Sequence, residues 1–277
     1  MPPQLPSHLE VGLHEKTLKN ALNESEDGRL RIHAEQLTRH LRDYIQSTER
    51  KVAIRQDYRL NRGLRLKALN NTSSCKDEDR LDATIHKFWR QIGQKDDFLR
   101  RTEDAQPIVK FIPCNQVPMY NQGGRGGKKD WGYIDLLGCG FADDPVVIEL
   151  KILRFNKGGK PRPETPLRAV VEALAYAISL RESWAIFHPQ WKLGVGSQRA
   201  LAKPSGLSLV VLGTTGYWKG VGESSWIEQA EQAMPEFIAA VKAEGFPCHF
   251  AEIDAECVSS KNRNWIIKGP AKEISPW

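Results

Sequence analysis

The sequence contains few cysteines and no long apolar run, and both absences narrow the class of protein. Its five cysteines are scattered, odd in number and never spaced as C-x-x-C, which argues against a disulfide framework and against a cysteine-based zinc site. No run approaches the roughly eighteen apolar residues of a membrane-spanning helix. The opening MPPQLPSHLEVG has neither a basic start nor an apolar stretch, so no secretory signal is expected. We therefore expect a soluble, cytoplasmic protein without a membrane partner.

Two common catalytic motifs are also missing. The Gly-rich segment NQGGRGGKKD is not a P-loop, because Lys129 follows Lys128 where Ser or Thr is required and Gln122 replaces the first Gly. The seven histidines are isolated and form no H-E-x-x-H motif. Neither the loop nor the histidines therefore indicate an active site.

The charge is basic, with a formal net charge of +6, and the basic residues are grouped. One group recurs at helical spacing and would lie on one face of a helix, and two others occupy Gly-rich segments. Each group alone is also typical of a solvated surface. Because the last two flank one pair of predicted strands, they favour a polyanion partner. The three groups are Arg55, Arg59 and Arg62; Arg125, Lys128 and Lys129; and Lys157, Lys160 and Arg162.

A change of pattern near residue 72 divides the chain. Residues 1–72 are polar, helical in pattern and without strand signals, which predicts an N-terminal helical, basic accessory region. Residues 77–258 combine helix and strand patterns with enough apolar residues for one core. Residues 259–277 show no clear pattern and are expected to be a C-terminal tail.

The predicted core reads as helix, three strands, helix, strand, helix, strand, which indicates an α/β fold with a mixed sheet flanked by helices. Thr165 and Pro166 form an N-cap and first-turn pair that opens the central helix. The predicted elements are a helix at Asp79–Ile92, strands at Pro107–Pro113, Trp131–Gly138 and Val146–Leu153, a helix at Pro166–Glu182, a strand at Leu207–Leu212, a helix at Ser225–Ala243 and a strand at Cys248–Ile253.

Charged residues interrupt two of the predicted strands. In VVIELKI, Glu149 and Lys151 are two residues apart and point to the same face. Burying both without partners would cost several kcal/mol. Asp135 interrupts the preceding strand in the same way. If a hairpin joins the two strands with Gly138 opposite Val146, Asp135 lies opposite Glu149.

Two carboxylates in such a position repel each other, and a bound divalent cation would remove that repulsion. Carboxylate oxygens, waters and substrate phosphate suit Mg²⁺ or Mn²⁺. Lys151 beside the cation could orient or deprotonate a water, or neutralise charge on a phosphate. The alternative is an ordinary ion pair of Lys151 with Glu149 or Asp135 at a strand end.

The segments GYIDLLG and VVIELKI resemble the PD-(D/E)xK nuclease superfamily, whose restriction-endonuclease-like fold is shared by RecB-like nucleases. The resemblance covers about residues 79–254 and implies an αβββαβ core. It also implies that Asp135, Glu149 and the backbone carbonyl of Leu150 bind the metal, and that Lys151 is the catalytic lysine.

The predicted central helix carries a second similarity. Glu172-x-x-x-Tyr176 is similar to the Gln-x-x-x-Tyr of RecB-like members, with Glu in place of Gln. The resemblance implies catalytic positions for Glu172 and Tyr176, whereas an i,i+4 ion pair of Arg168 with Glu172 is an equally good interpretation. Many relatives add an acidic residue from the first core helix. The candidates here are Glu78, Asp79 and Asp82, or Glu15 and Glu35 if earlier helices belong to the core.

Together these features predict a Mg²⁺-dependent deoxyribonuclease, an endonuclease rather than an exonuclease, that binds DNA through the three basic groups. The N-terminal region would bind flanking DNA or serve as the dimerisation element of a homodimer. Three alternatives stay open. They are a nuclease acting on RNA or on branched or single-stranded DNA, a catalytically silent nucleic-acid-binding or assembly module of the same fold, and a protein with a buried ion pair and no nucleic-acid role.

Overall fold

The computed structural model describes ten segments of the chain. They are residues 52–54, 77–90, 97–102, 106–121, 132–154, 164–182, 184–195, 207–222, 233–257 and 265–276. The three predicted basic groups and most of the predicted N-terminal region lie outside the described residues. Within these segments, no helix is long and apolar enough to cross a membrane.

Helices and strands alternate along the described chain. After β1 (Val52–Ile54), the elements are α3 (Asp77–Trp89), β2 (Leu99–Arg100), β3 (Pro107–Val109), β4 (Phe111–Asn121), β5 (Gly132–Cys139), β6 (Pro145–Lys151), α4 (Pro166–Glu182), α5 (Trp184–Val195), β7 (Ser208–Thr214), α6 (Thr215–Gly222), α8 (Ala233–Ala243), β8 (Cys248–Ile253), β9 (Ala255–Cys257), β10 (Trp265–Ile267) and β11 (Ala271–Ile274).

Nine of these strands form one mixed sheet, in the order β1-β4-β5-β6-β7-β8-β11-β2-β3. β4, β5 and β6 pair antiparallel, whereas β6, β7 and β8 pair parallel. Every residue of β6 is buried, as expected for a central strand covered on both faces. The protein is therefore a mixed α/β fold built on one large sheet.

The sheet bends round on itself at Lys110. β3 and β4 are separated only by this residue, yet they lie near opposite ends of the strand order. The backbone N–H of Lys110 donates to Cys139 O at 2.8 Å, and the backbone N–H of Phe98 donates to Lys110 O at 3.0 Å. The bend brings β3 and β5 into one hydrophobic cluster, in which Val109 and Leu136 are both buried.

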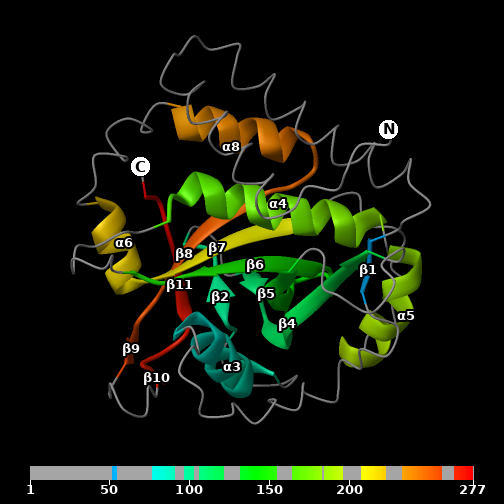
Figure 1. Cartoon of the computed structure of the whole chain (residues 1–277), viewed down its shortest axis with the longest axis horizontal. Coiled ribbons are helices and arrows are strands. Elements are labelled where there is room, and N and C mark those ends of the chain that lie inside the picture. Colours follow the sequence, from blue (N-terminus) through cyan, green and yellow to red (C-terminus); the bar gives the residue numbers. More distant parts are fainter. Residues whose placement is uncertain are drawn as a thin grey trace.

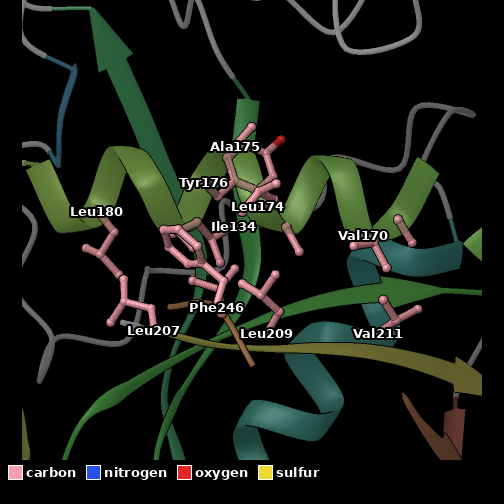
Figure 2. Close-up of a cluster of buried hydrophobic side chains, with 14 of the residues drawn as sticks. Ile134, Val170, Leu174, Ala175, Tyr176, Leu180, Leu207, Leu209, Val211 and Phe246 are labelled. Atoms are coloured by element: carbon pink, nitrogen blue, oxygen red, sulfur yellow. The ribbon is translucent and has the colours of Figure 1, made fainter. Parts of the chain in front are cut away.

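Helices cover both faces of the sheet. Figure 1 shows α4 and α8 on one side and α3 on the other. On the α4 side, Val170 and Leu180 of α4 lie in one buried cluster with Leu209 of β7 and with Phe246 (Figure 2). On the α3 side, Leu81 belongs to a separate cluster with the strands.

Successive residues of β6 alternate between these two clusters. Val147 belongs to the α4 cluster, and Ile148 and Leu150 belong to the α3 cluster. Because side chains alternate along a strand, Glu149 and Lys151 point to the α4 side. The sequence pattern predicted their shared face, and the packing shows which face it is.

Helix α4 has the predicted bounds, Pro166–Glu182. Its N-cap is also confirmed, because the backbone N–H of Arg168 donates to Thr165 Oγ1 at 3.3 Å. The helix is buried on nearly all sides, including Glu172 at 6% and Tyr176 at 5% exposure. These two residues therefore do not lie on a solvated helix face.

Other elements differ from the predictions in extent or kind. β8 has its predicted bounds, whereas the single strand predicted at Pro107–Pro113 is wrong, because the chain forms two strands there, β3 and β4, which lie near opposite ends of the strand order. The prediction of no strand before residue 72 is wrong at β1, which pairs antiparallel with β4. α5 and α6 were not predicted. Within the expected C-terminal tail, β11 pairs with both β8 and β2, so this segment contributes to the main sheet.

Glycine at position 213 is required by close packing. A Cβ there would lie 2.5 Å from Trp218 Nε1 and 2.5 Å from Tyr217 Cδ1, and both rings are buried. Gly213→Ala should therefore lower the free energy of unfolding by about 1–3 kcal/mol, as overpacking does. Urea denaturation followed by tryptophan fluorescence measures this.

Gly216→Ala is the matched control, because a Cβ at Gly216 meets no atom within 4 Å. Its unfolding free energy should stay the same or rise by up to about 1 kcal/mol. Equal stabilities for the two variants would contradict the packing described around Gly213.

Candidate active site

The hairpin of β5 and β6 has the register expected from the sequence. Leu136 pairs with Ile148, and Gly138 pairs with Val146. Beyond the Leu136–Ile148 pair, a side chain replaces the backbone as the partner of β6, because Asp135 Oδ2 accepts a hydrogen bond of 2.9 Å from the backbone N–H of Leu150. Asp135 is thereby held against β6 next to Glu149, and its charge acts on the Glu149 carboxyl.

The centre of the site is the ammonium group of Lys151, which contacts three carboxylates. Its Nζ lies 2.8 Å from Glu149 Oε1, 2.8 Å from Glu164 Oε2 and 3.0 Å from Glu172 Oε2. The Lys151 side chain is only 5% exposed, and those of Glu149 and Glu172 are each 7% exposed. An ammonium group has three N–H donors, so these carboxylates can satisfy all of them.

Two arginines extend this cluster outward. Arg168 Nε lies 3.0 Å from Glu172 Oε1, which confirms the i,i+4 ion pair, and Arg154 Nη1 lies 3.8 Å from Glu164 Oε1. Each arginine thus shares a carboxylate with Lys151. The Lys151 cluster is here defined as Asp135, Glu149, Lys151, Arg154, Glu164, Arg168 and Glu172.

Glu164 is the member of this cluster that sequence reasoning missed. It directly precedes the N-cap of α4, and its backbone carbonyl accepts a hydrogen bond of 2.8 Å from the Tyr217 hydroxyl of α6. No strand or helix pattern includes it, and α6 was itself unexpected. An acidic residue next to a clear N-cap was the only available signal.

Burial and mutual repulsion shift the carboxyl groups in different directions. Burial raises the pKa of Glu149 well above its usual value, and Asp135 adds to the effect despite Lys151. For Glu172, burial is outweighed by Lys151 and Arg168, so its pKa is lowered. Glu164 follows the same pattern, since Lys151 outweighs burial and lowers its pKa.

Lys151 and Tyr176 stay in their ordinary charge states. Burial opposes the charged form of Lys151, but the carboxylates of Glu149, Glu172 and Glu164 outweigh it and raise its pKa well above the usual value. Burial, followed by the charges of Glu149 and Glu172, raises the pKa of Tyr176. The site at neutral pH therefore holds an ammonium ion and a neutral phenol.

The cluster is richer in carboxylates than in cations. Its four carboxylates face one lysine and two arginines, and one buried oxygen, Glu149 Oε2, has no hydrogen-bond partner among the described residues. A buried carboxylate oxygen without a partner is costly, and a cation beside it would remove that cost. The hard oxygens of Asp135 and Glu149 are the donors that Mg²⁺ prefers, so the donor set fits.

The part of the chain that is described contains no ready-made metal cage. No group of three or more His, Cys, Asp or Glu side chains among these residues is arranged to hold a metal ion. Any cation would therefore depend on two carboxylates, on the backbone and on water, which is common for Mg²⁺.

The structure brings together the predicted residues Asp135, Glu149, Leu150, Lys151 and Glu172, and the charges of this group also act on Tyr176. α3, which carries Glu78, Asp79 and Asp82, packs on the opposite face of the sheet from Lys151. A further acidic ligand from that helix stays a prediction. Outside the described residues lie Glu15, Glu35 and the basic residues Arg55, Arg59, Arg62, Arg125, Lys128, Lys129, Lys157, Lys160 and Arg162.

Comparison of the chain with protein-family models, curated proteins and solved structures found no match. Its function is therefore argued from the Lys151 cluster.

Removing the Lys151 charge should leave buried carboxylates without compensation. We expect Lys151→Met to lower the free energy of unfolding by about 3–5 kcal/mol at pH 8. Without the ammonium, the pKa values of Glu149, Glu164 and Glu172 rise in the folded state. A carboxyl whose pKa is higher in the folded than in the unfolded protein makes the free energy of unfolding fall as pH rises. The deficit should therefore shrink as pH falls toward about 5, which urea denaturation across this range measures.

The double variant Lys151→Met with Glu149→Gln is the control, because it removes a carboxylate together with its partner. Its deficit at pH 8 should be smaller than that of the single variant. A deficit that is the same in both variants, or that does not change with pH, would contradict the charge assignment.

Proposed function

We propose that this protein is a Mg²⁺-dependent nuclease that hydrolyses phosphodiester bonds in DNA, with the restriction-endonuclease-like αβββαβ core of the PD-(D/E)xK superfamily. One observation carries the proposal. The half-buried Asp135 and the buried Glu149 lie beside Lys151, and a buried oxygen of Glu149 has no hydrogen-bond partner among the described residues.

The residues that would hold the cation are Asp135 and Glu149, together with the backbone carbonyl of Leu150. The backbone N–H of Leu150 already donates to Asp135, so these three residues adjoin each other. When bound, Mg²⁺ supplies charge stabilisation on the phosphate and a more acidic water. Mn²⁺ has the same preference for hard oxygen ligands and should substitute.

Lys151 would neutralise charge on the phosphate or orient the attacking water. Because three carboxylates hold its ammonium group, one of them must release it before it contacts substrate. Glu164 is 26% exposed, against 7% for Glu149 and for Glu172, so it is the partner on the open side. Glu172 would keep Lys151 oriented, and the neutral Tyr176 would supply a hydroxyl donor.

The proposal is favoured over a purely structural ion pair by the surplus of acid. The Lys151 cluster has four carboxylates against one lysine and two arginines, which is one carboxylate more than neutrality needs. Four buried or half-buried carboxylates repel one another, and a bound cation would reduce that repulsion. DNA as substrate, endonuclease action, a cytoplasmic location and a homodimer remain expectations from the sequence.

Cleavage assays test the proposal directly. Purified protein should cut linear, circular, single-stranded or branched DNA in Mg²⁺ or Mn²⁺ and be inactive in EDTA. Asp135→Asn keeps an oxygen for the Leu150 N–H, and Glu149→Gln keeps one for Lys151, so both should fold. Each should lose at least about a hundredfold in rate, because each removes a negatively charged ligand of the proposed cation. Glu172→Gln, which restores the residue of RecB-like members, should remain active.

The assay also separates the rival functions. Cleavage of RNA alone would change the substrate, and DNA binding without cleavage in every metal would indicate a catalytically silent module. Activity that persists in Asp135→Asn and Glu149→Gln would overturn the proposal.

Cation binding can be measured without catalysis. Mg²⁺ or Mn²⁺ at about a hundred times its dissociation constant should stabilise the protein by about 2.7 kcal/mol, seen as a rise in Tm by calorimetry. Asp135→Asn and Glu149→Gln should show no such rise. Equal shifts in the wild type and both variants would place any bound cation elsewhere.

A further inference from the structure

The open side of the Lys151 cluster is basic. The side chain of Arg154 is 41% exposed and that of Arg168 is 32% exposed, whereas Lys151 is 5% exposed. A ligand that approaches the cluster from solvent therefore meets two guanidinium groups, with Glu164 linking Arg154 to the lysine and Glu172 linking Arg168 to it.

Both arginines are held in place by carboxylates that also hold Lys151. Arg168 Nε lies 3.0 Å from Glu172 Oε1, and the other oxygen of Glu172 lies 3.0 Å from Lys151 Nζ. Arg154 Nη1 lies 3.8 Å from Glu164 Oε1, and the other oxygen of Glu164 lies 2.8 Å from Lys151 Nζ. The two guanidinium groups thus have a defined position relative to the proposed catalytic lysine.

The local backbone also favours an anion at this place. Arg168 lies in the first turn of α4, a helix of 17 residues, and helix N-termini carry partial positive charge. Arginine recognises phosphate oxygens through its planar fork of donors. The exposed Arg154–Glu164 pair, at 3.8 Å, contributes little to stability in itself.

We propose that Arg154 and Arg168 bind a phosphate of the DNA backbone next to the bond that is cut, and so position the strand over Lys151. The inference rests on the proposed function for the identity of the polyanion. It adds two described residues to the nucleic-acid interface, which the sequence assigned only to segments outside the described chain.

The test is DNA binding by fluorescence anisotropy, with a labelled duplex in EDTA and again in Ca²⁺, over a range of salt concentrations. The variant Arg154→Gln with Arg168→Gln should bind about tenfold more weakly or worse. The slope of log affinity against log salt should fall by about two, because two phosphate contacts are lost. Single variants should each lower the slope by about one.

Arg100→Gln is the matched control. Arg100 is 56% exposed and pairs with Asp97 at 2.9 Å, so it is an arginine in an ion pair outside the Lys151 cluster. Its affinity and salt slope should equal those of the wild type. A second variant, Arg154→Lys with Arg168→Lys, keeps both charges without the planar fork, so its salt slope should be unchanged and its affinity intermediate.

The outcomes distinguish this inference from the proposed function. Wild-type binding by the double glutamine variant, with cleavage that still requires Asp135, overturns the inference and leaves the nuclease. Weakened binding by that variant, in a protein that cuts no nucleic acid in any metal, supports the phosphate site and overturns the nuclease. Loss of affinity in Arg100→Gln to the same extent also overturns the inference, since an arginine outside the Lys151 cluster would then contribute as much to DNA binding as one inside it.

Discussion

The buried ammonium group of Lys151 is the interaction on which the rest of the site depends. Its three carboxylate partners come from β6, from the residue before the N-cap of α4 and from α4 itself. A charge this deeply buried is stable only with such partners. Lys151 therefore fixes how α4 and its leading segment sit on the central strand, and it holds three acidic residues in one place.

The sheet topology gives Lys151 this position. The β5–β6 hairpin stops pairing at Leu136 and Ile148, whereas β6 continues to pair with β7 as far as Lys151 opposite Gly213. The end of β6 therefore pairs with β7 but no longer with β5. On the β5 side, the Asp135 side chain bonds to the backbone of β6 instead. On the β7 side, the absence of a side chain at Gly213 lets Tyr217 and Trp218 pack closely. Tyr217 in turn holds the backbone of Glu164.

The chemistry follows from unequal charge compensation within one cluster. Glu149 lies deep, and burial and Asp135 raise its pKa, whereas Glu164 and Glu172 have lowered pKa values because lysine and arginine outweigh burial. Glu149 therefore keeps one oxygen without a hydrogen-bond partner among the described residues, whereas Glu164 and Glu172 each also pair with an arginine. That difference suits a cation beside Glu149 and an anion beside the arginines, which are the two charges that a metal-dependent attack on a phosphodiester brings into a site.

The hairpin register, the bounds of α4 and β8, and the proximity of Asp135, Glu149 and Lys151 could all be predicted from the sequence. Strand alternation and a Thr-Pro helix start are local signals, so no tertiary information was needed. The positions of Glu164, α6 and β11 depend instead on contacts between distant segments, and they became known from the structure alone. α6 contains Gly216, Gly220 and Gly222, which are poor helix formers, and it is held by the packing of Tyr217 and Trp218. Glu164 reaches Lys151 because β6, α4 and α6 meet there, and contacts between segments so far apart leave no local pattern in the sequence.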